Sequence, residues 1–185
     1  MPLSVPNESA LLVRVPAAEP AVSRHRNRYD AAARVGVPAH VTIAYPFKPT
    51  ELLTSSDLDA LTDVFARFRP VEVTFARTAW FGDEVLYLEP SDPRPLLALT
   101  GAIEKAFPKY PIYGGAYQTV HPHLTVGQTA DRAALQVVER DVLGFLPVRH
   151  FVSGVELWQG PALATGLGQW THAQTFPLQR VRAQD

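Results

Sequence analysis

Two short stretches decide how this sequence is interpreted: AHVTIA at residues 39–44 and PHLTVG at residues 122–127. They align His on His and Thr on Thr, with apolar residues between, and lie a little under half the chain apart. Alternate residues of a β-strand point to opposite faces, so each stretch predicts a strand with one imidazole and one hydroxyl on one face. The apolar side chains between them are expected to anchor the other face in the core.

The order of the surrounding elements repeats around these two stretches. In each half, hydrophobic periodicity and Pro or Gly punctuation predict strand, helix, strand, helix and strand. We therefore expect one bilobal, internally duplicated domain over residues 1–185, with repeats at roughly 9–81 and 84–177. The predicted strands are 10–15, 40–45, 71–80, 85–89, 123–128, 148–158 and 168–176. The predicted helices are 17–34, 51–68 with a possible internal cap at Ser55 or Ser56, 93–107, and one that Asp131 caps and that ends near Leu143.

The composition is that of a globular domain and excludes several classes of protein. The 185 residues include no cysteine, which excludes disulfide scaffolds, thiolate zinc sites and cysteine nucleophiles. Basic residues number 17 and acidic residues 18, a net charge of -1 that argues against a protein that grips long duplex nucleic acid. No stretch approaches the ~18 apolar residues of a membrane span, and the N-terminus lacks a basic signal-peptide region. We expect a soluble, cytoplasmic monomer with no membrane partner.

The paired His-x-Thr strands suit the cleavage of a phosphodiester. Related by a pseudo-two-fold axis, His40 and Thr42 would face His123 and Thr125. An unperturbed imidazole pKa of about 6.5 lets one neutral and one protonated histidine coexist, as a base and an acid require. The two hydroxyls can donate hydrogen bonds to the non-bridging oxygens of the phosphate. This scheme needs no cofactor.

A metal site is the alternative chemistry for the second stretch, because His121 and His123 form a His-x-His pair. Pro122 interrupts that run, and no third Asp, Glu or His stands at a matching spacing. We therefore predict no metal, with a metal-binding β-rich protein as the rival that metal analysis would reveal.

The motifs HVTI at 40–43 and HLTV at 123–126 resemble those of the 2H phosphoesterase superfamily, and within it the bacterial 2′-5′ RNA ligase-like (LigT-like) proteins. The contexts PAHVTIAYPF and YGGAY, the latter before HPHLTV, are similar to one bacterial branch. The resemblance implies an α+β fold with two antiparallel sheets and flanking helices around a central cleft. Many LigT-like proteins also carry an arginine shortly after the second motif, where this chain has Gln128.

The same resemblance implies metal- and ATP-independent cleavage of cyclic or 2′-5′ phosphodiesters. It makes His40 and His123 the acid and base, in an order that the near-symmetric motifs leave open, and it makes Thr42 and Thr125 phosphate-binding residues. The expected substrates are 2′,3′-cyclic phosphate ends of RNA or small cyclic nucleotides, and reversible 2′-5′ RNA ligation is compatible with the same groups. The rival from another class is a non-catalytic module that binds nucleotides or RNA ends, although both motifs retain their His and Thr.

Three further groups of residues are candidates for binding. Tyr113 and Tyr117 lie in the Gly-rich loop before the second motif, and either could stack on a base or donate to phosphate. Aromatic residues on adjoining strands are interpreted mainly as core: Trp80, Phe81 and Tyr87. A basic cluster on the first helix could guide an RNA backbone, but such faces are usually just solvated: Arg24, His25, Arg26 and Arg28.

Overall fold

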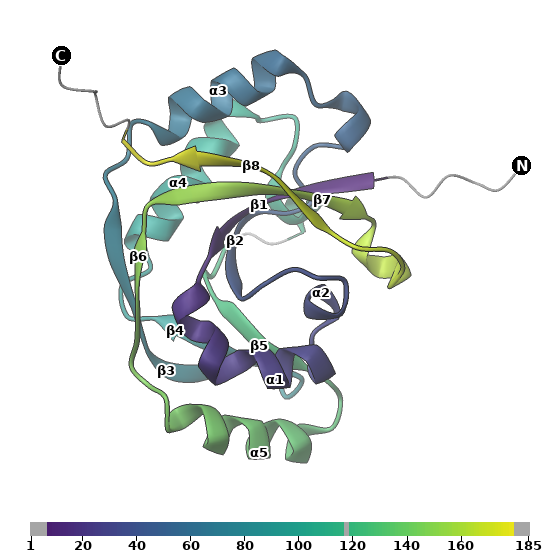
Figure 1. Ribbon diagram of the computed structural model, residues 1–185, viewed down its shortest axis with the longest axis vertical. Coiled ribbons are helices and arrows are strands. Elements are labelled where there is room, and N and C mark those ends of the chain that lie inside the picture. The colour runs from purple at the N-terminus through teal and green to yellow at the C-terminus, as the bar shows by residue number, and fades with distance from the viewer. Residues whose placement is uncertain (1–6, 117–118, 180–185) are drawn as a thin grey trace, which may run out of the picture.

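Eight β-strands form the framework of the fold within residues 7–116 and 119–179, the part of the chain that the structure, a computed structural model, describes (Figure 1). The strands are β1 (Asn7–Arg14), β2 (His40–Ala44), β3 (Val71–Phe81), β4 (Val85–Pro90), β5 (Leu124–Gln128), β6 (Val148–Val152), β7 (Gly154–Pro161) and β8 (Thr171–Pro177). They form two four-stranded sheets in the orders β2-β1-β7-β8 and β5-β4-β3-β6. Every pairing is antiparallel, as the resemblance implied.

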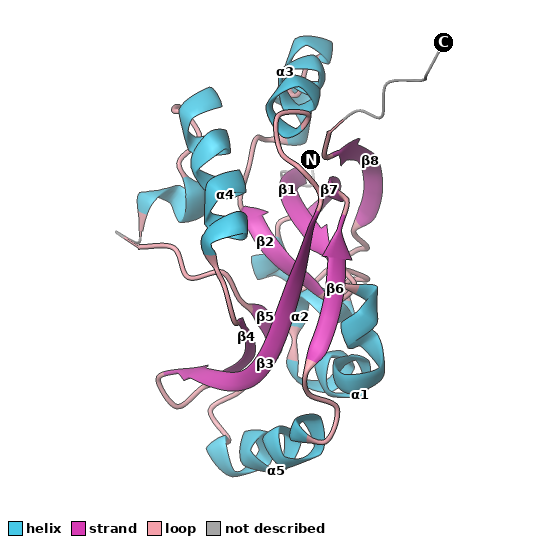
Figure 2. Cartoon of the chain, turned by 90° about the vertical axis from the view of Figure 1, so that its left-hand side faces the viewer, coloured by secondary structure: helices cyan, strands magenta, loops and turns pink. Residues whose placement is uncertain are grey.

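The helices cover the two sheets at different places (Figure 2). They are α1 (Glu19–Tyr29), α2 (Ala31–Arg34), α3 (Ser55–Phe65), α4 (Arg94–Ala106) and α5 (Arg132–Leu143). Short 3-10 turns occur at Pro16–Ala18, Thr50–Leu52, Ile112–Gly115 and Leu163–Thr165. The first sheet is packed by α3 against β8 and by α4 against β2, whereas α1 packs on β5 and α5 lies near β3. The α+β prediction is therefore confirmed.

The two sheets exchange strands between the two halves of the sequence. β3, from the first half, pairs with β4 and β6 in the second sheet. β7 and β8, from the second half, complete the first sheet beside β1. Each sheet nevertheless has the same plan, because a motif strand, β2 or β5, occupies one edge and pairs with a buried inner strand.

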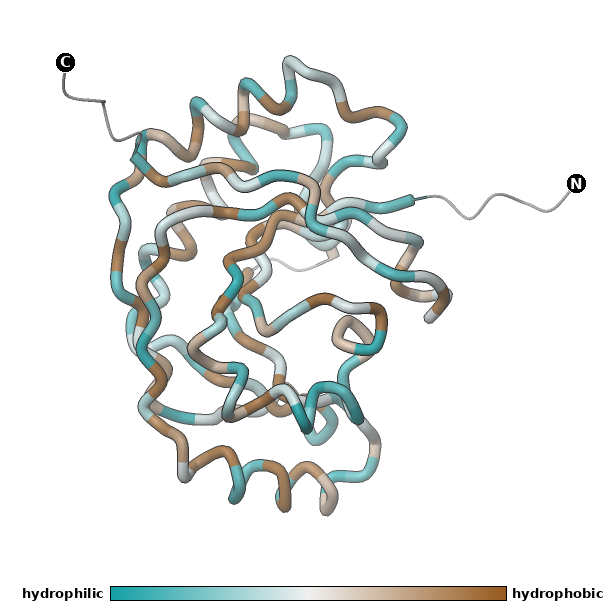
Figure 3. Tube along the Cα trace, viewed as in Figure 1, coloured by the Kyte–Doolittle hydropathy of each residue, from teal (hydrophilic) through white to brown (hydrophobic). Residues whose placement is uncertain are grey.

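One large hydrophobic core extends through both sheets and the helices that pack on them. Hydrophobic residues predominate along the central strands in Figure 3, whereas α5 alternates between hydrophobic and hydrophilic residues, as a half-buried helix requires. A smaller cluster lies on the other face of the first sheet and comprises Ala10, Leu12, Val35, Val37 and Trp170. Within the described ranges, no helix has the length and apolar character needed to cross a membrane.

Two predicted helices are shorter than the sequence indicated. The helix expected at 17–34 is interrupted at Asp30, whose backbone is extended (φ −121°, ψ 120°) and whose carboxylate accepts from the Ala32 N–H to start α2. The helix expected at 51–68 begins only at Ser55. Its N-cap is Thr54, which forms a reciprocal capping box with Asp57, so neither predicted serine is the cap.

The single strand predicted at 148–158 is wrong, because the chain passes from one sheet to the other at Ser153. β6 pairs with β3, and β7 pairs with β1 and β8. A Cβ atom at Gly154 would lie 3.0 Å from the Phe176 carbonyl oxygen, so glycine permits the close approach of β8 there. The sequence shows only Ser153 and Gly154 between two stretches rich in apolar residues, which does not reveal that the strands belong to different sheets.

Candidate active site

The first motif lies on β2, at the edge of its sheet. Val41 and Ile43 are fully buried in the core, whereas His40 and Thr42 project from the opposite face and are partly exposed. Antiparallel pairing with β1 places Arg14 opposite His40 and Leu12 opposite Thr42. The alternation predicted from the sequence is therefore confirmed for this strand.

The second motif repeats this arrangement on β5, the edge strand of the other sheet. Leu124 and Val126 are fully buried, and Thr125 is partly exposed on the opposite face, where it pairs with Tyr87 of β4. His123 is the residue immediately before the strand rather than its first residue.

Both histidines are oriented by the same backbone device. His40 Nδ1 lies 2.7 Å from the carbonyl oxygen of Pro38, and His123 Nδ1 lies 2.7 Å from that of His121. A carbonyl oxygen can only accept, so each Nδ1 must carry the hydrogen and donate it. The Nε2 atoms of both rings are thereby left to exchange protons with another group.

The fold brings the two motif strands together. β2 and β5 contact each other although they belong to different sheets, and α1 packs along β5. The packing of α1 on β5 depends on Gly127, because a Cβ atom there would lie 2.9 Å from the Cβ of Tyr29 on α1. A proton on His123 disfavours a second proton on His40, and the carboxylate of Asp30 favours the protonated form of both imidazoles.

Burial dominates the electrostatics of both imidazoles. Loss of solvation and the nearby Arg26 guanidinium lower the pKa of His40 to about 4, against the opposing hydrogen bond to Pro38 and the Asp30 charge. Burial likewise lowers the pKa of His123, and its hydrogen bond to His121 opposes that shift. Burial therefore favours the neutral form of both rings.

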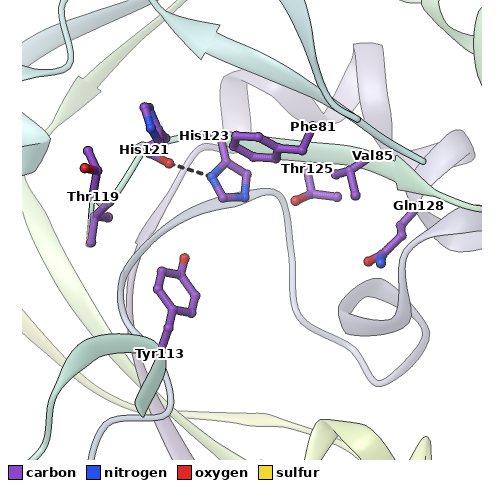
Figure 4. Close-up of a pocket in the computed structure, with 9 residues that line it drawn as sticks. Phe81, Val85, Tyr113, Thr119, His121, His123, Thr125 and Gln128 are labelled. Carbon is purple, nitrogen blue, oxygen red and sulfur yellow. Dashed lines mark hydrogen bonds between the residues drawn. The ribbon is translucent and has the colours of Figure 1, made fainter. Parts of the chain in front are cut away.

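A cavity of about 590 Å³ opens beside the second motif (Figure 4). Its lining comprises Phe81, Val85, Tyr113, Thr119, Val120, His121, His123, Thr125 and Gln128. His123, Thr125 and Gln128 lie along one wall, and Tyr113 points across from the opposite wall with its hydroxyl toward them. His40 and Thr42 do not line this cavity, so the structure places it to one side of the paired motifs.

A family model for the 2′-5′ RNA ligase superfamily matches residues 14–161, which include both motifs, the whole second sheet, and β2 and β7 of the first sheet. The chain belongs to this superfamily. No curated protein matches it at a significant level.

Solved structures support the same assignment at the level of the fold. Escherichia coli LigT in its apo form has 18% identity and a TM-score of 0.61, covering 96% of this chain and 100% of LigT. LigT complexed with 3′-AMP has 18% identity and a TM-score of 0.57, with 95% and 99% of the chains covered. A Thermus thermophilus protein has 17% identity and a TM-score of 0.60, with 95% and 100% covered. These similarities show that the chain has the fold of LigT.

In this LigT-like protein, the loop before the second motif holds Tyr113 in an unusual backbone conformation. Tyr113 has φ 53°, Gly114 has φ 61° and Gly115 has φ 77°, a left-handed run that a tyrosine rarely enters. The Tyr113 N–H donates to the Tyr45 carbonyl at 2.8 Å, which ties the loop to the end of β2. The second predicted tyrosine, Tyr117, lies outside the described residues.

The structure corrects the interpretation of Phe81. The sequence favoured a core role for Trp80, Phe81 and Tyr87. Tyr87 is buried and Trp80 packs against the main core, but Phe81 is partly exposed and lines the cavity. A β-bulge between Phe75 and Arg77 shifts the alternation along β3, and a bulge is not visible in the sequence pattern.

The basic cluster on α1 of this superfamily member is not a continuous surface. Arg26 is 2% exposed and forms a buried ion pair with Asp30, whereas Arg24 is on the surface and pairs with Asp141 at 2.8 Å. The spacing of Arg26 and Asp30, four residues apart on a helix, was the available signal for their contact. Among the described residues, no group of three His, Cys, Asp or Glu side chains could hold a metal ion.

Proposed function

We propose that this protein opens 2′,3′-cyclic phosphates at RNA ends or on small nucleotides, with His40 and His123 as the proton-transfer pair. The proposal is carried by one observation. His40 at the start of β2 and His123 directly before β5, two edge strands in contact, each donate Nδ1–H to a backbone carbonyl and leave Nε2 available. Membership of the 2′-5′ RNA ligase superfamily and LigT structures complexed with 3′-AMP and with NADP+ support a substrate that contains a nucleotide.

His40 is the better candidate for the base. A base must be neutral before the reaction, and the buried Arg26 guanidinium near His40 disfavours a second positive charge there. His123 lies on the cavity wall, where the negative charge of a bound phosphodiester would raise the pKa of its imidazole. The ring would then take up a proton from solvent and act as the acid.

The reaction then proceeds as follows. His40 removes a proton from a water molecule, whose oxygen forms a new bond to phosphorus. The bond from phosphorus to one ribose oxygen breaks, and His123 transfers its proton to that oxygen. Thr42 and Thr125 donate hydrogen bonds to the non-bridging oxygens, where negative charge accumulates. The product is a phosphomonoester beside a free ribose hydroxyl, and reversal of these steps with an RNA hydroxyl in place of water is a ligation.

The cavity supplies room for the nucleoside part of the substrate. Its volume lies within the range of 300–1,000 Å³ that is usual for small-molecule sites, and an aromatic ring stands on each of two walls. We assign binding of the nucleobase to Phe81 and Tyr113, because an aromatic face can stack on any nucleobase. Tyr117, from the same loop, stays a candidate for the same role.

The decisive experiment offers the purified protein a panel of 2′,3′-cyclic nucleotides, cyclic-phosphate oligonucleotides and 2′-5′ oligonucleotides. We expect opening of the cyclic phosphates, with the products identified as 2′- or 3′-phosphates by chromatography against standards. Saturable binding of these compounds without any product would instead favour the non-catalytic nucleotide-binding module.

A further inference from the structure

Helix α1 ends in a charged pair that is withdrawn from solvent. Arg26 is 2% exposed and Asp30 is 7% exposed. Arg26 Nε and Nη2 donate to Asp30 Oδ2 at 2.9 and 2.8 Å, and Asp30 Oδ1 accepts from the Ala32 N–H at 2.9 Å. A buried pair with these contacts is costly to disrupt, because loss of one partner leaves the other charge buried alone.

The same helix holds the segment that leads into the first motif. Arg26 Nη2 donates to the Val37 carbonyl at 3.2 Å, and Glu19 Oε1 accepts from the Ala39 N–H at 2.7 Å. Between these two anchors lies Pro38, whose carbonyl oxygen accepts the hydrogen bond from His40 Nδ1. The orientation of the His40 ring therefore depends on the anchors on either side of Pro38.

The pair also sets the charge around His40. The Arg26 cation opposes protonation of the imidazole, the Asp30 anion favours it, and the effect of Arg26 is the larger. The charged and titratable groups around His40 are Arg26 and Glu19 from α1, Asp30 directly after α1, His123 before β5, and Arg14 from β1, whose side chain is turned to Glu156.

We propose that Arg26 is a positioning residue for His40, acting through the Val37–Ala39 segment and through its buried charge, with Asp30 holding the guanidinium in place. This inference rests on the proposed role of His40 as the base. It assigns a function to the buried Arg26–Asp30 ion pair, which takes no direct part in the proposed reaction. It also explains why Arg26 is buried while the neighbouring arginines on α1 are at the surface.

Two variants separate the two effects. Arg26→Lys keeps the positive charge, but one ammonium group cannot reproduce the forked contacts to Asp30 and Val37. The double variant Arg26→Met/Asp30→Asn removes both charges together, which avoids an unpaired buried carboxylate. Arg24→Met is the matched control, because Arg24 lies on the same helix with its side chain 77% exposed.

The first measurement is the pKa of His40 by NMR titration of 13C-labelled histidine in the free protein. We expect the double variant to raise it by about half a unit or more, and Arg26→Lys and the Arg24→Met control to leave it near the wild-type value. An unchanged His40 titration in the double variant would overturn the role of the buried charge.

The second measurement is turnover of a 2′,3′-cyclic nucleotide as a function of pH. Arg26→Lys is expected to lower kcat about 10-fold with little change in KM, since a displaced base affects the transition state more than binding. Wild-type kcat in Arg26→Lys would overturn the positioning role. If the wild type turns over no cyclic phosphate, the proposed function fails, whereas the NMR titration still decides the effect of Arg26 on His40.

Discussion

Phe81 meets the imidazole of His123 edge-on, with ring centroids 4.9 Å apart and an interplanar angle of 85°. Phe81 is itself stacked on the buried Tyr87, with centroids 4.2 Å apart. The aromatic pair thus supports one side of His123 and at the same time forms part of the cavity wall. The Phe81 side chain therefore contacts His123, the proposed acid, and also forms part of the surface proposed to bind the nucleobase.

Replacement of this ring should weaken binding of the nucleoside. Phe81→Leu keeps apolar bulk but removes the π-face, and stacking on one base contributes about 1–3 kcal/mol, so we expect KM for cyclic nucleotides to rise roughly 5- to 100-fold. Ribose 2′,3′-cyclic phosphate, which has no base, is the control substrate, and its KM should hardly change. If KM rose equally for both substrates in steady-state assays, Phe81 would act only through its contact with His123 and not by stacking on the nucleobase.

Each histidine is expected to be necessary for turnover. His40→Asn and His123→Asn should each lower kcat at least about 100-fold, because general acid or base catalysis contributes about 10²–10⁴-fold. The double variant should lose little more than either single one, since the two groups act as a unit. Circular dichroism checks that the fold is intact, and near-wild-type rates in either single variant would refute the pairing.

Turnover should not depend on a divalent cation. The proposed steps use only two imidazoles and two hydroxyls, so we expect equal rates before and after dialysis against EDTA. Added Mg²⁺ or Mn²⁺ should then leave the rate unchanged. Loss of activity on chelation, restored by one cation, would replace this scheme with metal-assisted hydrolysis.

The lowered pKa of His40 predicts a specific dependence of stability on pH. With a folded pKa of about 4 and an ordinary value of 6.5, the unfolded chain binds a proton at His40 between these limits and the folded chain does not. The free energy of unfolding should therefore fall as the pH drops from 6.5 to 4, by up to about 3 kcal/mol from this group. Urea unfolding of the wild type and of His40→Asn at pH 7, 5.5 and 4 measures this free energy. If it depended on pH equally in both proteins, the lowered pKa of His40 would be contradicted.

The contact between α1 and β5 predicts opposite effects of alanine at two glycines. At Gly127 a Cβ atom would lie 2.9 Å from Tyr29 Cβ and 3.0 Å from Leu135 Cδ2, so Gly127→Ala should destabilise the protein by about 1–3 kcal/mol. At Gly101, in the middle of α4, a Cβ atom would meet nothing within 4 Å, so Gly101→Ala should be neutral or stabilise it by up to about 1 kcal/mol. Thermal unfolding of both variants tests these two expectations. If both substitutions changed the stability equally, Gly127 would not be needed for the close packing of α1 on β5.

The motif strands could be predicted from the sequence because their pattern is local. Alternation of polar and apolar residues in HVTI and HLTV is enough to assign the faces, and burial of Val41, Ile43, Leu124 and Val126 confirms it. The helix cap at Asp131 was equally local and is confirmed by the bond from the Ala134 N–H at 3.0 Å.

The features that were missed depend on non-local structure. Phe81 reaches the cavity because of a β-bulge, and the change of sheet at Ser153 depends on where β8 lies. Arg26 looked like one cation in a basic run, and only the packing of α1 against the segment before β2 buries it. The cavity itself lies beside one motif, an asymmetry that two matching His-x-Thr sequences cannot indicate.

The exchange of strands between the sheets has a consequence for how this protein comes to be active. A nascent chain that has emerged only as far as β3 has His40 on a two-strand ribbon, β1 with β2, whose neighbour β7 has not been synthesised. β3 at that stage also lacks both of its partners, β4 and β6. We therefore expect neither half to be stable or competent alone, and separately expressed halves, cut at the β3–β4 turn, to recover activity only after they associate. Phosphodiester cleavage would then begin only once synthesis and folding of both halves are complete.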